Sequence, residues 1–504
     1  MQRPSRRLAL IAALASTALA LTACTGDQAE PGEPPSGEVD SNATLTVGLV
    51  LEPTNLDIRR TDGSALEQIL IDNIYEGLVT RSGNEIVERL ASSYEISEDA
   101  LTYTFTLREG VTFHDGDELE ASDVVASFEE VRSDEGLHSH SDFAGVESIE
   151  APDEQTVVIT LSEPNVNFLF ALTGRAGLVF QEGDRTDLKT AENGTGPFTL
   201  SRWSQGSSIT FQRYEDYWDG PAGVAEVVFD YITDATARIN SALDGSVDVL
   251  VRVDPNLAPQ LGDSGDFEIV QAGTTSTGTL AFNNARAPLT DERVREALRL
   301  AIDHDAIVEA LGAGQTLFGP IPELDPGYED LSEVAPHDPD RAAQLLADAG
   351  QENLELTLTI ANHYSTTIPR LLVSDLAKVG VTLDVNVVEF ATWLEDVYTN
   401  KDYDLSFVEH TEARDFVNFA NPNYYFLYDN PEVQDLYAEA LRQSDLDAAA
   451  ALLARAARIV SEDHAADWLF TVTSVNAVRP GVIDFPDALT NARLDLRDVT
   501  VLAG

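Results

Sequence analysis

The stretch that decides the fold reads Phe113-His114-Asp115-Gly116, followed after four residues by Ala121-Ser122-Asp123-Val124 and then by Ser127-Phe128. Apolar residues alternate over 103–107, just before this stretch, and the alternation predicts a strand. Gly110 and Gly116 are typical of tight turns, because glycine adopts backbone angles that other residues avoid. We therefore interpret His114 as a turn histidine that bonds to the protein, in preference to a metal ligand.

Further short motifs lie on both sides of this stretch. They are Asn73-Ile74-Tyr75-Glu76-Gly77-Leu78, Leu90-Ala91, Gly194-Thr195-Gly196-Pro197-Phe198, Tyr217-Trp218, Phe282-Asn283, Arg293-Val294-Arg295-Glu296-Ala297, Ala301-Ile302-Asp303 and Leu345-Leu346-Ala347-Asp348-Ala349-Gly350. In this order the set resembles the family 5 extracellular solute-binding proteins, which are the oligopeptide, dipeptide and nickel receptors of ABC importers. Each motif alone is a weak signal, whereas the ordered set is specific. The resemblance runs from about residue 45 to the C-terminus.

The resemblance implies an α/β fold with two lobes, of the type II periplasmic-binding-protein kind and its large peptide-binding subclass. It also implies an extra small domain in the first half and a hinged cleft between the lobes. The expected boundaries are lobe I at 44–84, 191–278 and 471–504, the accessory domain at 85–190, and lobe II at 279–470.

Periodicity in the second half supports this α/β class. Strand, helix and strand patterns follow one another over 354–387, which predicts a βαβ unit with a parallel strand pair. Apolar residues over 294–302 recur with helical spacing, and Thr290 is the expected N-cap of that helix.

The first 43 residues have the composition of an export signal and a tether. Three arginines precede an apolar run at 8–21, and Leu21-Thr22-Ala23-Cys24 ends in the only cysteine of the chain. This pattern resembles a bacterial lipoprotein signal, so we predict a signal peptide at 1–23 and acylation of Cys24. The alternative is an ordinary secretory signal in which Cys24 is incidental. Residues 24–43 are rich in proline, glycine and acids, which predicts a flexible tether.

The chain is strongly acidic, with a formal charge of −56 at pH 7. Such a surface repels nucleic acid and anionic lipid, so we expect no nucleic-acid partner and a membrane contact through the lipid anchor alone. The expected location is extracytoplasmic, on the outer face of the cell membrane, or on the periplasmic side where an outer membrane exists. We expect a monomer.

The resemblance further implies a receptor and not an enzyme. We expect no catalytic residue, no cofactor and no resident metal, and the expected partners are a small solute, by family frequency a short peptide, and the permease and ATPase subunits of the importer. A nickel or metal-chelate receptor, another non-peptide receptor and a non-transporting sensory lipoprotein are the alternatives. A hydrolase would need a nucleophile with its base or a carboxylate pair, and no spacing indicates one.

Ligands of this family bind between the lobes, where strand ends and the loops after them line the cleft. By position, the candidate ligand-binding residues are Glu52, Thr54, Tyr75, Glu76, Asn283, His363, Tyr364, Trp393, His410, Glu412, Arg414, Asp415 and Phe416.

Residues 409–416 carry the most specific expectation. In peptide-binding members of the family, an aspartate here pairs with the amino terminus of the peptide, commonly near a tryptophan. Asp415 is that candidate, although the tryptophan is missing and Glu412 and Arg414 are added. Arg414 could instead bind a carboxylate or phosphate in bidentate fashion. A solvated loop, with its charges paired internally, is the third interpretation.

Two further clusters have a functional and a structural interpretation. His138, His140 and Asp142 are residue types that bind metals, but their acidic, loop-like surroundings favour a solvated loop. The aromatic stretch 421–426 could stack on a ligand, and we favour packing within the lobe.

Overall fold

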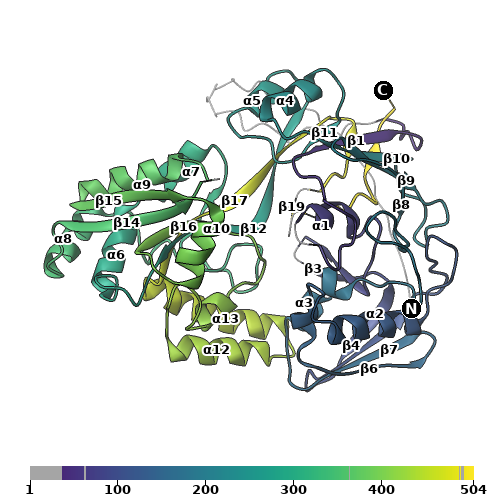
Figure 1. The fold of residues 1–504 in the computed structure, drawn as a ribbon, viewed down its shortest axis with the longest axis horizontal. Coiled ribbons are helices and arrows are strands. Elements are labelled where there is room, and N and C mark those ends of the chain that lie inside the picture. Colours follow the sequence, from purple (N-terminus) through teal and green to yellow (C-terminus); the bar gives the residue numbers. More distant parts are fainter. Residues whose placement is uncertain are drawn as a thin grey trace, which may run out of the picture. The chain divides into compact units, whose positions relative to one another are not determined.

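A long mixed β-sheet connects the two halves of the sequence (Figure 1). In this computed structural model the described residues are 37–503, apart from 62, 63, 84, 363, 487 and 490–492. The chain divides into the units Met1–Gly37 and Glu38–Gly504, and every described helix and strand belongs to the second unit. The predicted signal peptide, Cys24 and the predicted tether as far as residue 36 lie outside the described residues.

The elements follow one another along the chain in a mixed order. The first are β1 Thr44–Leu49, α1 Ser64–Leu70, β2 Val79–Ser82, β3 Glu85–Glu88, β4 Ala91–Ile96, β5 Thr102–Leu107, α2 Ala121–Ser133, the 3-10 helix η1 His140–Phe143, β6 Val146–Asp153, β7 Thr156–Leu161, α3 Phe168–Ala171, the 3-10 helix η2 Arg175–Gly177, β8 Phe198–Ser204, β9 Ser208–Arg213, β10 Glu226–Tyr231, α4 Ala235–Leu243, β11 Val249–Leu250 and α5 Pro259–Gly262. The remaining elements are β12 Glu268–Phe282, α6 Glu292–Ala301, α7 His304–Leu311, β13 Gln315–Thr316, α8 Pro339–Asp348, β14 Leu354–Ala361, α9 Thr367–Lys378, β15 Val381–Val388, α10 Phe390–Trp393, the π-helix η3 Leu394–Thr399, β16 Leu405–His410, α11 Val417–Ala420, α12 Pro431–Leu441, α13 Leu446–Glu462, β17 Ala466–Val478, β18 Val482–Ile483, β19 Ala488–Leu489 and β20 Thr500–Val501.

Two long antiparallel strands, β12 and β17, join the halves of the main sheet. Within the described residues this sheet has 12 strands, ten of them in the order β15-β14-β16-β12-β17-β11-β1-β10-β9-β8, while β13 pairs with β17 and β19 with β12. The pairing of β12 with β17 changes register between Gly273 and Thr277 and again between Gly278 and Thr279. Such irregularities bend strands. The expected boundaries between the lobes, at 278/279 and 470/471, fall inside these two strands.

Gly278 has a packing reason to be glycine. A Cβ atom at this position would lie 2.4 Å from the Phe470 ring of the neighbouring strand, so any larger residue would push β12 and β17 apart. The close approach therefore fixes the position of one bend in the sheet.

A second sheet, with the order β4-β5-β7-β6, lies within the predicted accessory segment 85–190. Figure 1 shows α2 beside this sheet. The buried apolar residues of the sheet share a core with α2, and Phe113 of the deciding stretch belongs to that core. Gly110 and Gly116 have φ angles of 77° and 97°, which confirms the predicted turns. The ring nitrogens of His114 lie 2.5 Å from a carboxylate oxygen of Glu192 and 2.9 Å from the carbonyl oxygen of Gly196, so His114 is the predicted turn histidine.

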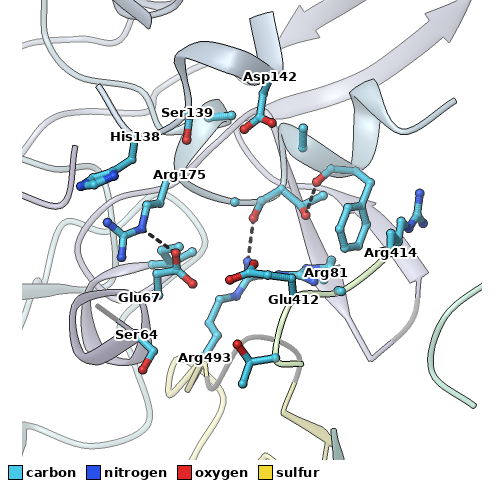
Figure 2. Close-up of a pocket in the computed structure, with 18 of the residues that line it drawn as sticks. Ser64, Glu67, Arg81, His138, Ser139, Asp142, Arg175, Glu412, Arg414 and Arg493 are labelled. Atoms are coloured by element: carbon cyan, nitrogen blue, oxygen red, sulfur yellow. Dashed lines mark hydrogen bonds and ion pairs between the residues drawn. The ribbon is translucent and has the colours of Figure 1, made fainter. Parts of the chain in front are cut away.

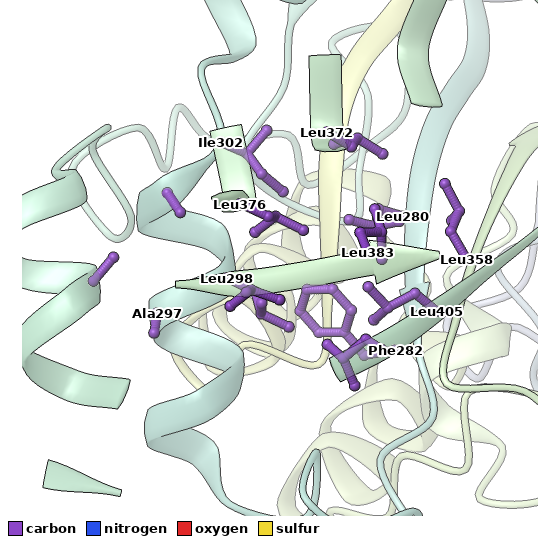
Figure 3. Close-up of a cluster of buried hydrophobic side chains, with 14 of the residues drawn as sticks. Leu280, Phe282, Ala297, Leu298, Ile302, Leu358, Leu372, Leu376, Leu383 and Leu405 are labelled. Carbon is purple, nitrogen blue, oxygen red and sulfur yellow. The ribbon is translucent and has the colours of Figure 1, made fainter. Parts of the chain in front are cut away.

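The second half contains the predicted βαβ unit. Strands β14 and β15 are parallel partners, and α9 connects them. Figure 3 shows Leu372 and Leu376 of α9 beside Leu358 and Leu383 in the core that these elements share. The predicted N-cap of α6 is wrong by one residue. Asp291, not Thr290, caps the helix, because its carboxylate accepts a 3.0 Å hydrogen bond from the Arg293 amide.

The described end of the predicted tether is attached to the C-terminal strand. The amide of Asp40 donates to the carbonyl of Val501 at 2.8 Å, and the amide of Ala503 donates to the carbonyl of Glu38 at 2.7 Å. In the part of the chain that the structure describes, no helix has both the length and the apolar character needed to span a bilayer.

Candidate ligand-binding site

A cavity of about 650 Å³ lies between segments from both halves of the chain (Figure 2). Its walls come from α1, β2, the α3–η2 segment, β12, β17 and the loop after β16. The charged lining residues are Glu67, Arg81, Asp142, Arg175, Arg252, Glu412, Arg414 and Arg493. These are five arginines and three carboxylates, which give the lining a formal excess of positive charge although the whole chain carries −56.

Three carboxylates form the negative part of the lining. Glu67 of α1 accepts a 2.5 Å hydrogen bond from Nε of Arg175. Withdrawal from water raises the pKa of Glu412, and the neighbouring Glu67, Asp415 and Asp142 carboxylates raise it further, against the effect of Arg175. Burial also raises the pKa of Asp142. Because these carboxylates repel one another, a ligand ammonium group placed among them would be stabilised.

The arginines of the lining differ in the hydrogen bonds and ion pairs that their guanidinium groups form within the protein. Nη1 of Arg493 donates to the Thr173 carbonyl at 2.7 Å, and Nη2 pairs with the Asp72 carboxylate at 2.6 Å. By contrast, no hydrogen bond or ion pair joins the guanidinium groups of Arg81 or Arg252 to any other described residue. These two arginines therefore keep donors for an anionic group of a ligand.

The predicted loop contributes residues 411–414 to the cavity wall, and two of these four, Glu412 and Arg414, are predicted ligand-binding residues. The Arg414 guanidinium lies 3.9 Å from the centroid of the Phe170 ring, and its Nη1 donates to Oδ1 of Asn167 at 3.2 Å. The backbone amide of Arg414 donates to Asp325 at 2.6 Å. Figure 2 shows Glu412 and Arg414 together with Arg81, which comes from the other half of the chain.

The other candidates of this loop lie outside the lining of the large cavity. His410 and Asp415 face each other at 3.1 Å, and Nε2 of His410 is 3.0 Å from the Tyr425 hydroxyl. Asp415 and Phe416 border a much smaller void of about 20 Å³. The internal pairing of the loop therefore joins His410 with Asp415, and the role of Asp415 as an ammonium partner stays a prediction.

The candidates from the first half make contacts within the protein. Glu52 accepts a 2.8 Å hydrogen bond from the Trp203 indole, while Thr54 is exposed. Tyr75 is buried against Phe180, with ring centroids 4.9 Å apart. Glu76 is fully buried, 2.8 Å from Nε of Arg89 and hydrogen bonded to the Tyr217 hydroxyl. None of these four candidates is among the residues that line the cavity.

Three candidates from the second half also contribute to packing. The side-chain Nδ2 of Asn283 donates to the carbonyls of Lys401 and Tyr403. The Trp393 indole donates to Ser406 at 2.9 Å within a hydrophobic core. The Tyr364 hydroxyl accepts from the Glu409 amide at 3.0 Å. These side chains do not line the cavity, and His363 lies outside the described residues. The aromatic stretch 421–426 contributes to packing, which is the interpretation favoured from the sequence, and its residues Tyr425 and Phe426 are buried.

A family model decides the identity of the chain, since the model for the bacterial extracellular solute-binding proteins, family 5 (middle region), matches residues 85–432. The chain is a family 5 solute-binding protein. Such proteins are extracytoplasmic substrate-binding components of ABC importers.

Two curated relatives illustrate the range of this family. Heme-binding protein A of Haemophilus influenzae is 28% identical over 427 residues, which cover 75% of this chain and 77% of that protein. Di/tripeptide-binding protein 4 of Pseudomonas aeruginosa is 29% identical over 418 residues, which cover 75% and 78% of the two chains.

Solved structures have the same fold. HbpA2 from Haemophilus parasuis gives a TM-score of 0.82 at 23% identity, over 92% of this chain and all of that one. NikA from Brucella suis, in complex with Fe(III)-EDTA, gives 0.81 at 20% identity, over 91% of this chain and all of that one. The two-lobed α/β fold of the periplasmic binding proteins is therefore the fold of this family 5 protein.

Several lining residues of this family 5 protein were missed by the sequence analysis. Arg81 and Arg252 belong to this group, as do the hydroxyl residues Thr274, Ser276 and Ser474 of the two long strands. Threonine and serine inside an otherwise buried strand are the signal that could have indicated the cavity wall, because buried polar groups need partners. The sequence around Arg81 gives no such signal, because β2 is too short to show a pattern of buried residues.

The structure also bears on the metal interpretation of residues 138–142. His138 and Asp142 line the cavity, whereas Nδ1 of His140 faces the Val131 carbonyl at 3.0 Å. Among the described residues, no group of three or more His, Cys, Asp or Glu side chains converges in a way that could hold a metal ion.

Proposed function

We propose that this protein is the lipid-anchored receptor of an ABC importer, and that it captures a short peptide in the 650 Å³ cavity and delivers it to the membrane permease. The charge pattern of the cavity carries this proposal. Carboxylates from α1, η1 and the loop after β16 are suited to an ammonium group, and arginines of the same cavity are suited to a carboxylate. A peptide is a zwitterion that carries both groups.

The size of the cavity supports a ligand of this class. Pockets for small molecules usually enclose roughly 300–1,000 Å³, and the cavity lies within that range. Its polar lining suits a peptide backbone, whose amides and carbonyls need hydrogen-bond partners once they leave water. Hydroxyls of Thr274, Ser276 and Ser474 stand beside the charged groups for this purpose.

Closure of the two lobes is the proposed mechanism of capture. The contacts that join the accessory segment to the second half include Arg414 over Phe170, the hydrogen bond from Arg414 to Asn167, and a 2.8 Å hydrogen bond from the Val166 amide to the Leu441 carbonyl. The bends of β12 and β17 near Gly278 provide a place for rotation. A ligand that touches both walls would shift the population toward the closed form, because it binds that form better.

Retention at the membrane is proposed to depend on Cys24, which follows the apolar run of the predicted signal. Two or more acyl chains on this residue would give stable anchoring, where one chain is marginal. Cys24→Ala is expected to move the protein from the membrane fraction to the medium or the periplasm. If Cys24→Ala stayed in the membrane fraction as wild type does, the lipid anchor would be disproved.

An anionic metal chelate is the second candidate ligand. The observation that favours it is the excess of arginine over carboxylate in the lining. Solved relatives include a complex with Fe(III)-EDTA, which is a chelate of this kind. Such a ligand lacks an ammonium group and would offer the Asp142 and Glu412 carboxylates no cationic partner.

Titration calorimetry with Ala-Ala and N-acetyl-Ala-Ala separates the two candidates, since acetylation removes the ammonium group and keeps the carboxylate. We expect Ala-Ala to bind, and N-acetyl-Ala-Ala to bind at least about tenfold more weakly. Binding of Fe(III)-EDTA without binding of either peptide would refute the peptide proposal.

A further inference from the structure

The guanidinium of Arg81, on β2, is a charged group of the cavity wall whose buried N–H donors lack acceptors. Its Nε and Nη1 atoms are buried and have no hydrogen-bond partner, and within the described residues no carboxylate pairs with it. The guanidinium lies over the Phe170 ring, 4.7 Å from the ring centroid. Burial, with the neighbouring Arg493, lowers the pKa of Arg81 to about 9. Buried polar groups are almost always hydrogen bonded, so Arg81 lacks a partner that a ligand could supply.

Arg414 approaches the same ring from the other half of the chain. Its guanidinium lies 3.9 Å from the Phe170 centroid, and its buried Nε has no hydrogen-bond partner. Burial lowers the pKa of Arg414 to about 10. Two cations on one ring repel each other, and an anion that touches both would remove the repulsion and provide the missing acceptors.

The nearby carboxylates do not fill this role. A chamber of about 220 Å³ borders on Arg81, Phe170 and Arg414, and its acidic residues are Asp325 and Asp447. Asp325 bonds to the backbone amide of Arg414, and Asp447 is an exposed residue of the first turn of α13. Neither carboxylate forms an ion pair with Arg81 or Arg414. Both guanidinium groups therefore border the cavities and keep N–H donors that are not bonded to a protein acceptor.

We propose that Arg81, Phe170 and Arg414 form a second anion subsite, which binds a side-chain carboxylate and makes acidic peptides the preferred ligands. This inference rests on the proposed function. Arg252, which lines the same cavity as Thr274 and Ser276, offers a separate position for the terminal carboxylate. A ligand with one ammonium group and two carboxylates also matches the positive excess of the lining, whereas a neutral peptide does not.

Titration calorimetry with Ala-Glu and Ala-Gln tests the subsite on the purified full chain, on Arg81→Gln and on the control Arg132→Gln. The two peptides share both termini and differ only in the side-chain carboxylate. Arg132 is an exposed residue of α2, and Glu129 is its only ion-pair partner among the described residues. We expect wild type and Arg132→Gln to bind Ala-Glu about tenfold or more tightly than Ala-Gln, and Arg81→Gln to lose this preference because its affinity for Ala-Glu falls much further than its affinity for Ala-Gln.

Three other results would overturn the inference and leave the peptide proposal intact. They are equal affinity of wild type for both peptides, a preference that survives in Arg81→Gln, and an equal loss of both affinities in Arg81→Gln, which would place the terminal carboxylate at Arg81. If neither peptide bound, the peptide proposal itself would fail. Thermal unfolding with glutarate would then decide the subsite: a rise in Tm for wild type but not for Arg81→Gln supports it, and equal shifts reject it.

Discussion

The Arg414 guanidinium lies 3.9 Å from the centroid of the Phe170 ring, and this contact joins the loop after β16 to helix α3. The two residues are far apart in the sequence, and both line the cavity. Arg414 also has a φ angle of 58°, which is uncommon for a residue other than glycine. The strain is consistent with a side chain that is directed into the cleft and toward its partner.

Arg414→Leu is expected to favour the open form. The change removes the cation–π contact and the hydrogen bond to Asn167, which together are worth on the order of 1–3 kcal/mol. We expect about tenfold weaker binding of Ala-Ala by calorimetry, and a larger radius of gyration by small-angle scattering without ligand. Arg455→Leu, at an exposed position on α13, is the matched control. Identical scattering from the two variants would show that Arg414 does not hold the lobes together.

Glu412→Gln is expected to weaken Ala-Ala binding by about tenfold, because a neutral amide replaces one of the lining carboxylates that are proposed to bind the ligand ammonium group. Affinity for N-acetyl-Ala-Ala should be unchanged, since that ligand has no ammonium group. Glu439→Gln, an exposed change on α12, is the control. An equal loss for both ligands would mean that Glu412 acts on the shape of the cavity and not on the ligand charge.

Arg89→Met is expected to be strongly destabilising. Arg89 is buried with the Glu76 and Asp72 carboxylates, 2.8 Å and 3.7 Å from its Nε. Removing one partner of a buried ionic group leaves an uncompensated charge and costs about 3–5 kcal/mol. The free energy of unfolding in urea measures this loss, and the surface change Arg132→Met should stay within about 0.5 kcal/mol of wild type. Similar stability of both variants would contradict the assigned role of Arg89.

Asp325→Asn is expected to change how stability depends on pH. Burial raises the pKa of Asp325 to about 7, from an ordinary value of about 3.9. The folded state therefore holds this proton more tightly than the unfolded state does, so the stabilisation is complete below pH ~4 and is lost as the pH rises toward ~7. Because asparagine does not titrate, the Tm of Asp325→Asn minus that of wild type should increase from pH 4 to pH 8. A constant difference would refute the raised pKa. Asp384→Asn, at an exposed position of β15, is the control.

The fold could be predicted where local pattern and packing agree. The alternation at 103–107 predicts strand β5, and the pattern over 354–387 predicts the parallel pair β14–β15 with α9 between them. Capping was less certain, because Thr290 and Asp291 are both good N-cap residues and only the geometry of the Arg293 amide distinguishes them.

The site was predicted less completely, because its residues come from segments that no local pattern connects. Glu412 and Arg414 line the cavity, whereas Tyr75 and Glu76 are buried among other side chains. The position of a residue directly after a strand does not determine whether its side chain points toward the cavity or away from it. The motif that contains Gly194 and Gly196 is typical of a tight return, and the structure adds a packing reason for it. A Cβ atom on Gly194 would lie 1.9 Å from the Ile74 carbonyl oxygen.

Native mass spectrometry of the protein, purified gently from its own host, tests most directly whether the cavity holds a peptide. The account predicts a folded protein whose bound masses resolve, on dissociation, into short peptides with free amino termini. It further predicts that Glu412→Gln carries much less of this bound material. A single bound non-peptide mass that is retained equally by wild type and by Glu412→Gln would contradict the account.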